Sequence, residues 1–255
     1  MTDDDLSAFT GLRPPQFRGL VDRMWAVRPD RQRGRAWKLS FADRVLLITT
    51  AYRTNLTDRQ LGPLFGISKS AVDRVLHDLA PVLAGLLEEP SADQRELWVV
   101  DGTLIAVHDH TRTAKSKNYR RSSNVQIVAR AKDRRVVAVG KAWPGNRNDS
   151  LVFREPLSQE LPEHRRLSGD GGYRGSDIIR TPDRGPDGKI IRDAKYKRFS
   201  KRRAVTEHTI ARLKDWQILR QCRRRGDGID YTVRGVAVLH NLEVEMQVSA
   251  LQDIS

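Results

Sequence analysis

One apolar stretch, from Glu96 to Val107, constrains this chain more than any other because a carboxylate stands in its middle. The stretch is rich in β-branched residues and has the character of a buried strand, interrupted only by Asp101 and Gly102. An acid inside a buried strand is costly unless it is paired, hydrogen-bonded or bound to a metal. The prediction of function therefore depends on which groups Asp101 meets.

The charge of the whole chain points to a polyanionic partner. Its 255 residues carry a net charge of +14 and give an isoelectric point near 10.4. Such an excess is most often found in proteins that bind nucleic acid, although an arginine-rich composition with solvated charges is the alternative. Clustering favours nucleic acid, since basic residues gather at Arg31 to Lys38, Arg112 to Arg121, Lys195 to Arg203 and Arg223 to Arg225.

Targeting signals and cysteine usage favour a cytoplasmic protein. No apolar run approaches the roughly 20 residues of a membrane span, and the acidic start lacks the pattern of a signal peptide. The single cysteine, Cys222, excludes an internal disulfide and fits a reducing compartment. We expect no membrane partner.

The first third of the chain predicts an all-α domain. Residues 1–36 are expected to form a loosely attached N-terminal segment. Within residues 37–90, helix starts at Ser40 and Thr57 and a break at 66–68 predict a helix-turn-helix. Any hairpin of two helices is the alternative, and Pro63 inside the first helix is a misfit. The second helix exposes the residues expected to bind DNA, namely Lys69, Ser70, Arg74 and His77, with Asp73 among them.

A polar boundary at residues 88–95 separates this region from a domain of strands, expected over 96–255. Three strands (96–107, 125–129 and 135–142) predict an antiparallel meander. A short helix capped by Asp149 or Ser150, a fourth strand (166–169), a basic segment that is extended or mobile (195–203) and helices over 204–219 and 233–248 follow. The expected fold class is α/β.

Three acids occupy characteristic places in this order of elements. Asp101 lies on the first strand, Asp170 directly follows the fourth strand, and Glu207 lies on the helix after it. This is the arrangement of a ribonuclease-H-like fold, a mixed sheet flanked by helices that supports metal-dependent phosphoryl transfer. Each acid alone also has a bland explanation, as a turn residue or a solvated helix residue.

The segments around these acids resemble the signatures of DDE transposases. They are Val100-Asp101-Gly102-Thr103, Gly169-Asp170-Gly171-Gly172-Tyr173 and the run from Glu207 to Trp216. The similarity is greatest to insertion-sequence transposases of the IS-five type and to Harbinger-like relatives. The loop from Gly145 to Ser150 is similar to a Gly-x-x-His-Asp-Ser loop of that family, with Asn148 where many relatives have histidine. The resemblance covers about residues 37–250.

The resemblance implies an enzyme that binds the inverted repeats of its own element, cuts the ends and joins them to target DNA. It implies two Mg²⁺ or Mn²⁺ ions held by Asp101, Asp170 and Glu207, and a homo-oligomer assembled on double-stranded DNA. An inactive DNA-binding protein of transposon origin and a two-metal endonuclease that cuts without joining are the rival interpretations.

Several polar residues near the acids have more than one interpretation. Asp149 is expected to cap a helix, but as the second metal ligand it would make Asp170 structural. His108 and His110 lack the spacing of a metal site and are expected to line a loop or face DNA. The remaining basic residues expected to bind DNA are Lys115, Lys117, Arg120, Arg121, Lys197, Arg198, Lys201, Arg202 and Arg203.

Overall fold

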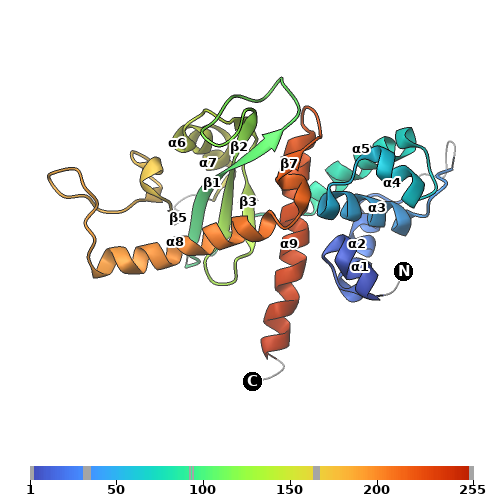
Figure 1. Ribbon diagram of the computed structural model, residues 1–255. Coiled ribbons are helices and arrows are strands. Elements are labelled where there is room, and N and C mark those ends of the chain that lie inside the picture. The colour runs from blue at the N-terminus through green and yellow to red at the C-terminus, as the bar shows by residue number, and fades with distance from the viewer. Residues whose placement is uncertain (1–2, 31–35, 92, 94, 163–166, 253–255) are drawn as a thin grey trace. The chain divides into compact units, whose positions relative to one another are not determined.

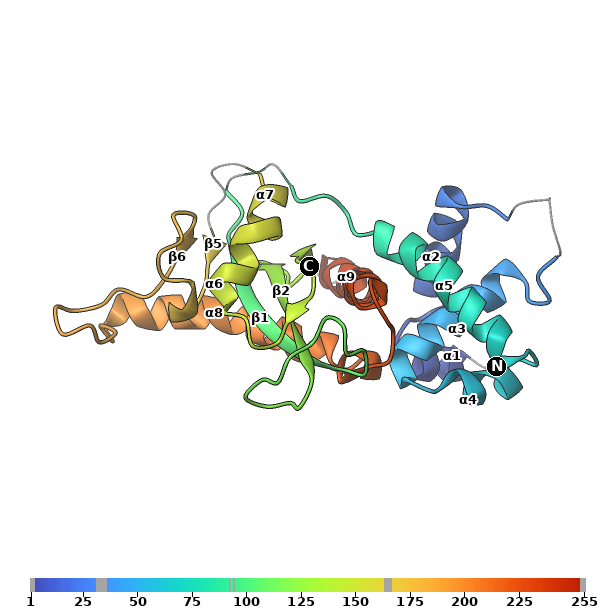
Figure 2. The same cartoon turned by 90° about the horizontal axis from the view of Figure 1, so that it is seen from above.

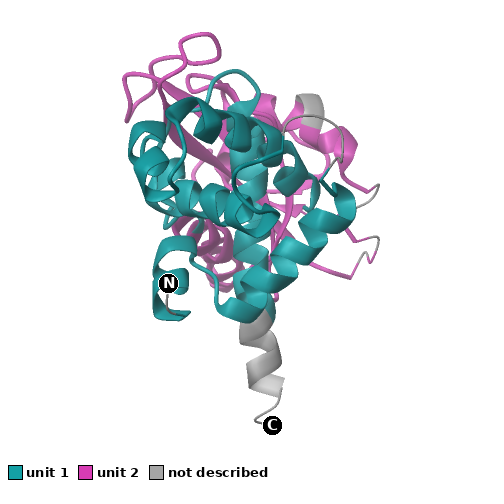
Figure 3. Cartoon of the chain, turned by 90° about the vertical axis from the view of Figure 1, so that its right-hand side faces the viewer, with its two compact units in different colours: residues 1–87, 213–255 teal, residues 88–212 magenta. Residues whose placement is uncertain are grey.

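The computed structural model describes residues 3–30, 36–91, 93, 95–162 and 167–252, and these divide into two compact units (Figure 3). Residues 1–87 and 213–255 form a helical unit, and residues 88–212 form a sheet unit. No helix within the described ranges has the length and apolar character needed to cross a bilayer.

The helical unit contains five helices from the first third of the chain and a long one from its end (Figure 1). They are α1 (Asp3–Thr10), α2 (Pro14–Val27), α3 (Phe41–Thr54), α4 (Asp58–Leu64), α5 (Lys69–Gly85) and α9 (Gly228–Gln252), with the short elements η3 (Gln217–Leu219) and β7 (Gln221–Cys222).

The helix-turn-helix forms where the local signals predict it. Ser40 and Ser68 cap α3 and α5, because their side chains accept hydrogen bonds from backbone N–H groups three residues later. Thr57 begins α4 with a reciprocal capping box. Gly66, at φ +62°, makes the turn before α5. Pro63 is tolerated on an exposed surface of α4.

The expectation of a loosely attached N-terminal segment is wrong for the residues described. Leu12, Leu20 and Met24 are fully buried in the helical unit. The buried Gln16 side chain donates a 2.6 Å hydrogen bond to the carbonyl of Leu242 in α9. Apolar burial therefore fixes α1 and α2 to the rest of this unit. Residues 31–35, part of the first basic cluster, lie outside the described residues.

Helix α9 belongs to the helical unit, which departs from the expectation that 96–255 fold as one domain. It packs along α5, and Gly235 lies so close to Tyr52 and Leu83 that a Cβ there would stand 3.0 and 3.2 Å from their side chains. Its apolar residues, such as Val236 and Leu239, are fully buried. The hydrophobic face of α9 thus completes the core of the helices at the start of the chain.

The sheet unit is built on a mixed sheet with the strand order β3-β2-β1-β5-β6. Its strands are β1 (Trp98–Val107), β2 (Ser122–Arg130), β3 (Val136–Val139), β4 (Trp143–Pro144), β5 (Leu167–Ser168) and β6 (Ile179–Arg180). The first three strands pair antiparallel, which confirms the meander. β5 runs parallel to β1, as a ribonuclease-H-like order requires. Arg166, expected at the start of the fourth strand, lies outside the described residues.

Short helical elements cover one face of this sheet (Figure 2). They are α6 (Asp149–Val152), η1 (Phe153–Leu157), α7 (Ser158–Glu160) and η2 (Gly171–Tyr173). Phe153, Leu157 and Tyr173 pack there against Trp98 and Val100 of β1. The fold is therefore an N-terminal helix-turn-helix region followed by a ribonuclease-H-like mixed sheet with helices.

The last helix of the sheet unit, α8 (Ala194–Leu213), corrects a prediction. Residues 195–203 were expected to be extended or mobile, but they form the first half of one continuous helix that also carries Glu207 (Figure 1). Asp193 accepts a 2.8 Å hydrogen bond from the backbone N–H of Tyr196 at its start. This side-chain contact stabilises the first turn despite the density of positive charge.

Candidate active site

Asp101 lies on β1, and Asp170 lies just beyond the end of the neighbouring parallel strand β5. In the ladder between β1 and β5, Trp98 is opposite Leu167 and Val99 is opposite Ser168. Continuing this register brings Asp101 opposite Asp170, which follows β5 after Gly169. Two acids far apart in the sequence are thus brought together by strand pairing.

The environment of Asp101 makes its charge costly. Burial is the main cause that raises the pKa of Asp101 from 3.8 to about 6, and the charge of Asp170 raises it further. Arg203 and a 2.9 Å hydrogen bond from the backbone N–H of Gly102 lower it, while Asp149 has the smallest raising effect. A carboxylate that repels a second one in this way is typical of a cation site.

Glu207 lies on α8 next to a cation that also approaches Asp170. The Arg203 guanidinium, one helical turn before Glu207, forms an ion pair with the Glu207 carboxylate. The same guanidinium lies 3.7 Å from Oδ2 of Asp170. The Glu207 side chain is half exposed. Arg203 therefore places a positive charge beside Asp170 and Glu207.

The three predicted acids do not form a closed metal site here. Across the described ranges, no group of three or more His, Cys, Asp and Glu side chains is arranged to hold a metal ion. Asp101 and Asp170 are coupled electrostatically, whereas Glu207 is connected to them through Arg203. Carboxylate oxygens are the ligands that Mg²⁺ and Mn²⁺ prefer, so the donor set fits such an ion chemically.

Asp149 is held by side-chain amides and does not cap α6, contrary to expectation. Asn148 is the cap, because its Oδ1 accepts a 2.8 Å hydrogen bond from the backbone N–H of Ser150. Oδ1 of Asp149 instead accepts hydrogen bonds from Asn124 (2.7 Å) and Gln126 (3.0 Å), both on β2. The acid thereby fastens the start of α6 to the sheet.

Two buried residues near the acids, Gln126 and Tyr173, were missed by the sequence analysis. The Tyr173 hydroxyl donates to Oε1 of Gln126, and both side chains are fully buried. Burial, followed by the charges of Asp149, Asp101 and Asp170, raises the pKa of Tyr173. A glutamine in the apolar run of residues 125–129 was a visible signal, by the same argument that drew attention to Asp101.

The basic residues expected to contact DNA are on surfaces. In α5, Lys69, Ser70, Arg74 and His77 are exposed. In the sheet unit, the loop between β1 and β2 exposes Lys115, Lys117, Arg120 and Arg121, and α8 exposes Lys197, Arg198, Lys201 and Arg202, whereas Arg203 is partly buried. His108 and His110 are exposed at the start of the same loop. Exposure makes these side chains accessible to a polyanion.

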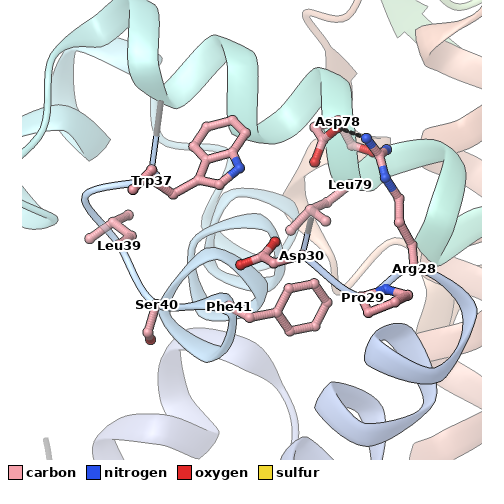
Figure 4. A pocket seen from close by; sticks show the side chains of 10 residues that line it. Arg28, Pro29, Asp30, Trp37, Leu39, Ser40, Phe41, Asp78 and Leu79 are labelled. Carbon is pink, nitrogen blue, oxygen red and sulfur yellow. Dashed lines mark hydrogen bonds and ion pairs between the residues drawn. The ribbon is translucent and has the colours of Figure 1, made fainter. Parts of the chain in front are cut away.

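The helical unit has a pocket of about 430 Å³ beside the helix-turn-helix (Figure 4). Trp37, Phe41 and Leu79 contribute apolar walls, and an ion pair between Arg28 and Asp78 closes one side at 2.5 Å. The pocket contains none of the predicted acids. We assign it no chemistry.

Comparisons with known proteins agree on one family. A family model described as the transposase DDE domain matches residues 93–242, and another, described as the helix-turn-helix of DDE superfamily endonucleases, matches residues 37–89. One relative, from Streptomyces albus G, is named as a transposase for insertion sequence element IS112. It is 42% identical to this chain over 244 residues, which cover 93% of this chain and 94% of that protein.

The chain also has more distant similarities. A Microchaete diplosiphon protein named as transposase for insertion sequence element IS702 is 26% identical over 271 residues, covering 97% of each protein. Among solved structures, a pre-cleavage Mos1 transpososome contains a chain that is 12% identical, with a TM-score of 0.23 and coverage of 87% of this chain and 81% of that one.

Proposed function

This chain belongs to the transposase DDE family, and from this premise we propose that it cuts the ends of an insertion sequence and joins them to target DNA. The observation that carries the proposal is the parallel pairing of β1 with β5, whose register, continued by two residues, would place Asp101 opposite Asp170. In this proposal Asp101, Asp170 and Glu207 are the catalytic acids. The finer assignment, to the IS-five group with Harbinger-like relatives, rests on the motifs around these acids.

Asp101, Asp170 and Glu207 are also the residues proposed to hold two Mg²⁺ or Mn²⁺ ions, since the family generally uses divalent metals. A bound metal pair supplies activation of the attacking oxygen and stabilisation of the leaving one. Burial and the charge of Asp170 raise the pKa of Asp101, and a bound cation would offset both effects by favouring the ionised carboxylate. Arg203 neutralises part of the acidic charge from the α8 side.

DNA is the proposed partner of both units. In the helical unit, the exposed face of α5 with Lys69, Ser70, Arg74 and His77 is proposed to read the terminal repeats. In the sheet unit, the basic residues of the β1–β2 loop and of α8 are proposed to bind phosphates near the acids. Pairing of two element ends implies a homo-oligomer on DNA, acting on chromosomal DNA in the cytoplasm.

The test is an assay of cleavage and strand transfer with labelled element ends. Asp101→Asn, Asp170→Asn and Glu207→Gln should each reduce cleavage by at least about a thousandfold, since each removes a charge that acts in the transition state. Binding to the same ends, measured by mobility shift, should persist. Retained cleavage in one variant removes that residue from the triad.

The same assay separates the rival functions. Joined products on the gel support a transposase, whereas cut ends without joined products indicate an endonuclease. Binding without either product in the unsubstituted protein indicates a DNA-binding protein without catalytic activity.

A further inference from the structure

A largely buried hydrogen-bond network connects the start of α6 to the turn that carries Asp170. It starts at Asp149, whose Oδ1 accepts from Asn124 and Gln126 at 2.7 and 3.0 Å. Nε2 of Gln126 also donates to Oδ1 of Asn124 at 3.2 Å. Oε1 of Gln126 accepts from the hydroxyl of Tyr173, three residues after Asp170. The network thereby joins three segments of the sheet unit.

Most of the network is buried and closely packed, and Asp149 is its partly exposed end. Gln126 and Tyr173 have no exposed surface, and the Tyr173 ring packs edge-on against Phe153 with centroids 6.1 Å apart. Leaving any of these buried polar groups without a partner would incur its full desolvation cost. Each member therefore holds its neighbours in position.

The network also passes directly beside Asp101, at the position of Gly102. A Cβ on Gly102 would lie 2.2 Å from Oδ1 of Asp149 and 2.8 Å from Nε2 of Gln126. Because side chains alternate along a strand, Asp101 projects to the opposite face of β1. Asp149 is consequently on the other side of the strand from the Asp101 carboxylate, which agrees with its small effect there.

At its other end, the network fixes the turn of Asp170. The turn η2 is closed by a 2.7 Å hydrogen bond from the backbone N–H of Gly172 to Oδ1 of Asp170. The backbone N–H of Tyr173 donates to the carbonyl of Asp170 at 3.3 Å. Anchoring the Tyr173 ring and hydroxyl therefore determines where the Asp170 backbone leaves β5.

We infer that Asp149, Gln126 and Tyr173 are positioning residues that hold Asp170 beside Asp101, and that Asp149 is not a ligand of the metal. This inference rests on the proposed function, in which Asp101 and Asp170 bind divalent cations. Under this inference the second acid is Asp170 rather than Asp149. Groups that support metal ligands in this way typically change metal affinity by about 10- to 100-fold when removed.

The experiment measures Mn²⁺ binding to the full chain by electron paramagnetic resonance of the free ion. The Asp101→Asn variant is the reference for a protein that has lost binding at the proposed site. Tyr173→Phe, which removes only the hydroxyl, should weaken Mn²⁺ binding about tenfold. The matched control is Tyr52→Phe, which alters another buried tyrosine in the helical unit and should leave Mn²⁺ binding unchanged. Equal affinities for these two variants would overturn the inference.

Two substitutions of Asp149 separate a positioning residue from a ligand. Asp149→Asn keeps an oxygen that can accept from both amides and should weaken Mn²⁺ binding only a few-fold, whereas Asp149→Ala should weaken it at least about tenfold. A loss with Asp149→Asn as severe as with Asp101→Asn would make Asp149 a ligand and contradict us.

Failure of the proposed function has a different signature. If Asp101→Asn bound Mn²⁺ as tightly as the unsubstituted protein, Asp101 would not be a metal ligand. That result would contradict the proposed function, whatever the Tyr173 and Asp149 variants do. Thermal melts of each variant identify any that fail to fold. If the Asp149 variants do not fold, the milder Tyr173→Phe change still tests the inference.

Discussion

The helix-turn-helix and the region around Asp101 use polar residues in opposite ways. On α5, the polar side chains Lys69, Ser70, Arg74 and His77 are exposed, and the apolar side chains beneath them form the core. Around Asp101, the polar side chains of Gln126 and Tyr173 are themselves buried and depend on one another. A substitution on α5 therefore leaves its neighbours in place, whereas a substitution around Asp101 disturbs the residues bonded to it.

This contrast has a physical origin in what each region does. A surface that binds a polyanion needs accessible charges, and each makes a separate contribution to affinity. A site that brings like charges together needs a rigid surrounding structure, because Asp101 and Asp170 repel each other. We therefore expect substitutions to have local effects on α5 and propagated effects in the sheet unit.

The largest expected effect is that of Gly102→Ala. The new methyl group would meet Asp149 at 2.2 Å, so the network must separate, and unfolding free energy should fall by about 2–3 kcal/mol. Misplacement of the acids should also lower cleavage about a hundredfold. Chemical denaturation and the cleavage assay measure the two effects.

The matched control for Gly102 is Gly19→Ala in α2, where a Cβ has no atom within 4 Å. It should be neutral or raise the unfolding free energy by about 0.5–1 kcal/mol, since alanine favours a helix. If the two variants changed the unfolding free energy by the same amount, the proposed contrast between the two regions would be wrong.

Arg74→Ala should weaken binding to the element ends by about 1–3 kcal/mol and relax sequence preference at one position. The substitution should not alter the arrangement of the acids, so the rate of cleavage of bound DNA should be unchanged. Competition mobility shifts with altered ends measure the preference. Arg18→Ala, an exposed arginine on α2, is the control for the lost charge. A uniform loss across sequences would make Arg74 a phosphate contact.

Asp101→Asn should stabilise the metal-free protein at neutral pH by about 1–2 kcal/mol, because it removes a buried charge. The pKa of Asp101 is raised to about 6, so the native state binds its proton more tightly than the unfolded state does. The ionised acid therefore destabilises the fold above this pH and not below 3.8, where it is protonated in both states.

Thermal or urea denaturation in chelator, at a series of pH values, tests this expectation. The gain from Asp101→Asn should grow as pH rises from below 4 to above 6. The exposed Asp187→Asn should show no comparable gain. A gain that is independent of pH would show that the charge of Asp101 is not its cause.

The smallest effect should come from Ser68→Ala, which removes the cap of α5. The lost hydrogen bond to the backbone N–H of Ala71, 3.2 Å long, should cost about 1 kcal/mol of unfolding free energy. The nearby exposed Ser70→Ala, whose residue is not the cap, is the control and should change it by less. A larger loss in Ser70→Ala would mean that the α5 surface also contributes to stability.

Local signals account for the parts of the fold that the sequence predicted. Ser40, Thr57, Ser68 and the glycine turn specify helices within a few residues of themselves, and the meander follows from alternation and a short turn. The ribonuclease-H-like order followed from the succession of elements. These features depend on neighbours in sequence, which a single sequence displays.

The incorrect predictions concern packing between distant segments. The attachment of α1 and α2 depends on packing against α3 and α5 and on the hydrogen bond from Gln16 to α9. The helical state of residues 195–203, by contrast, prevails over their crowded charge. Likewise, Asp149 binds amides on β2 rather than capping α6. The pairing of Asp101 with Asp170 could be expected only through the fold, and the role of Glu207 remains a prediction.

The closing of the helical unit by α9 has a consequence for the timing of synthesis. The partners of Tyr52 and Leu83 in α9 are translated after the whole sheet unit, so a ribosome-bound chain has its helix-turn-helix but not the core behind it. Chains that end prematurely should lack a fully stable helical unit and compete poorly for DNA. Only a chain that already contains every acid of the proposed site can complete the unit proposed to read the element ends.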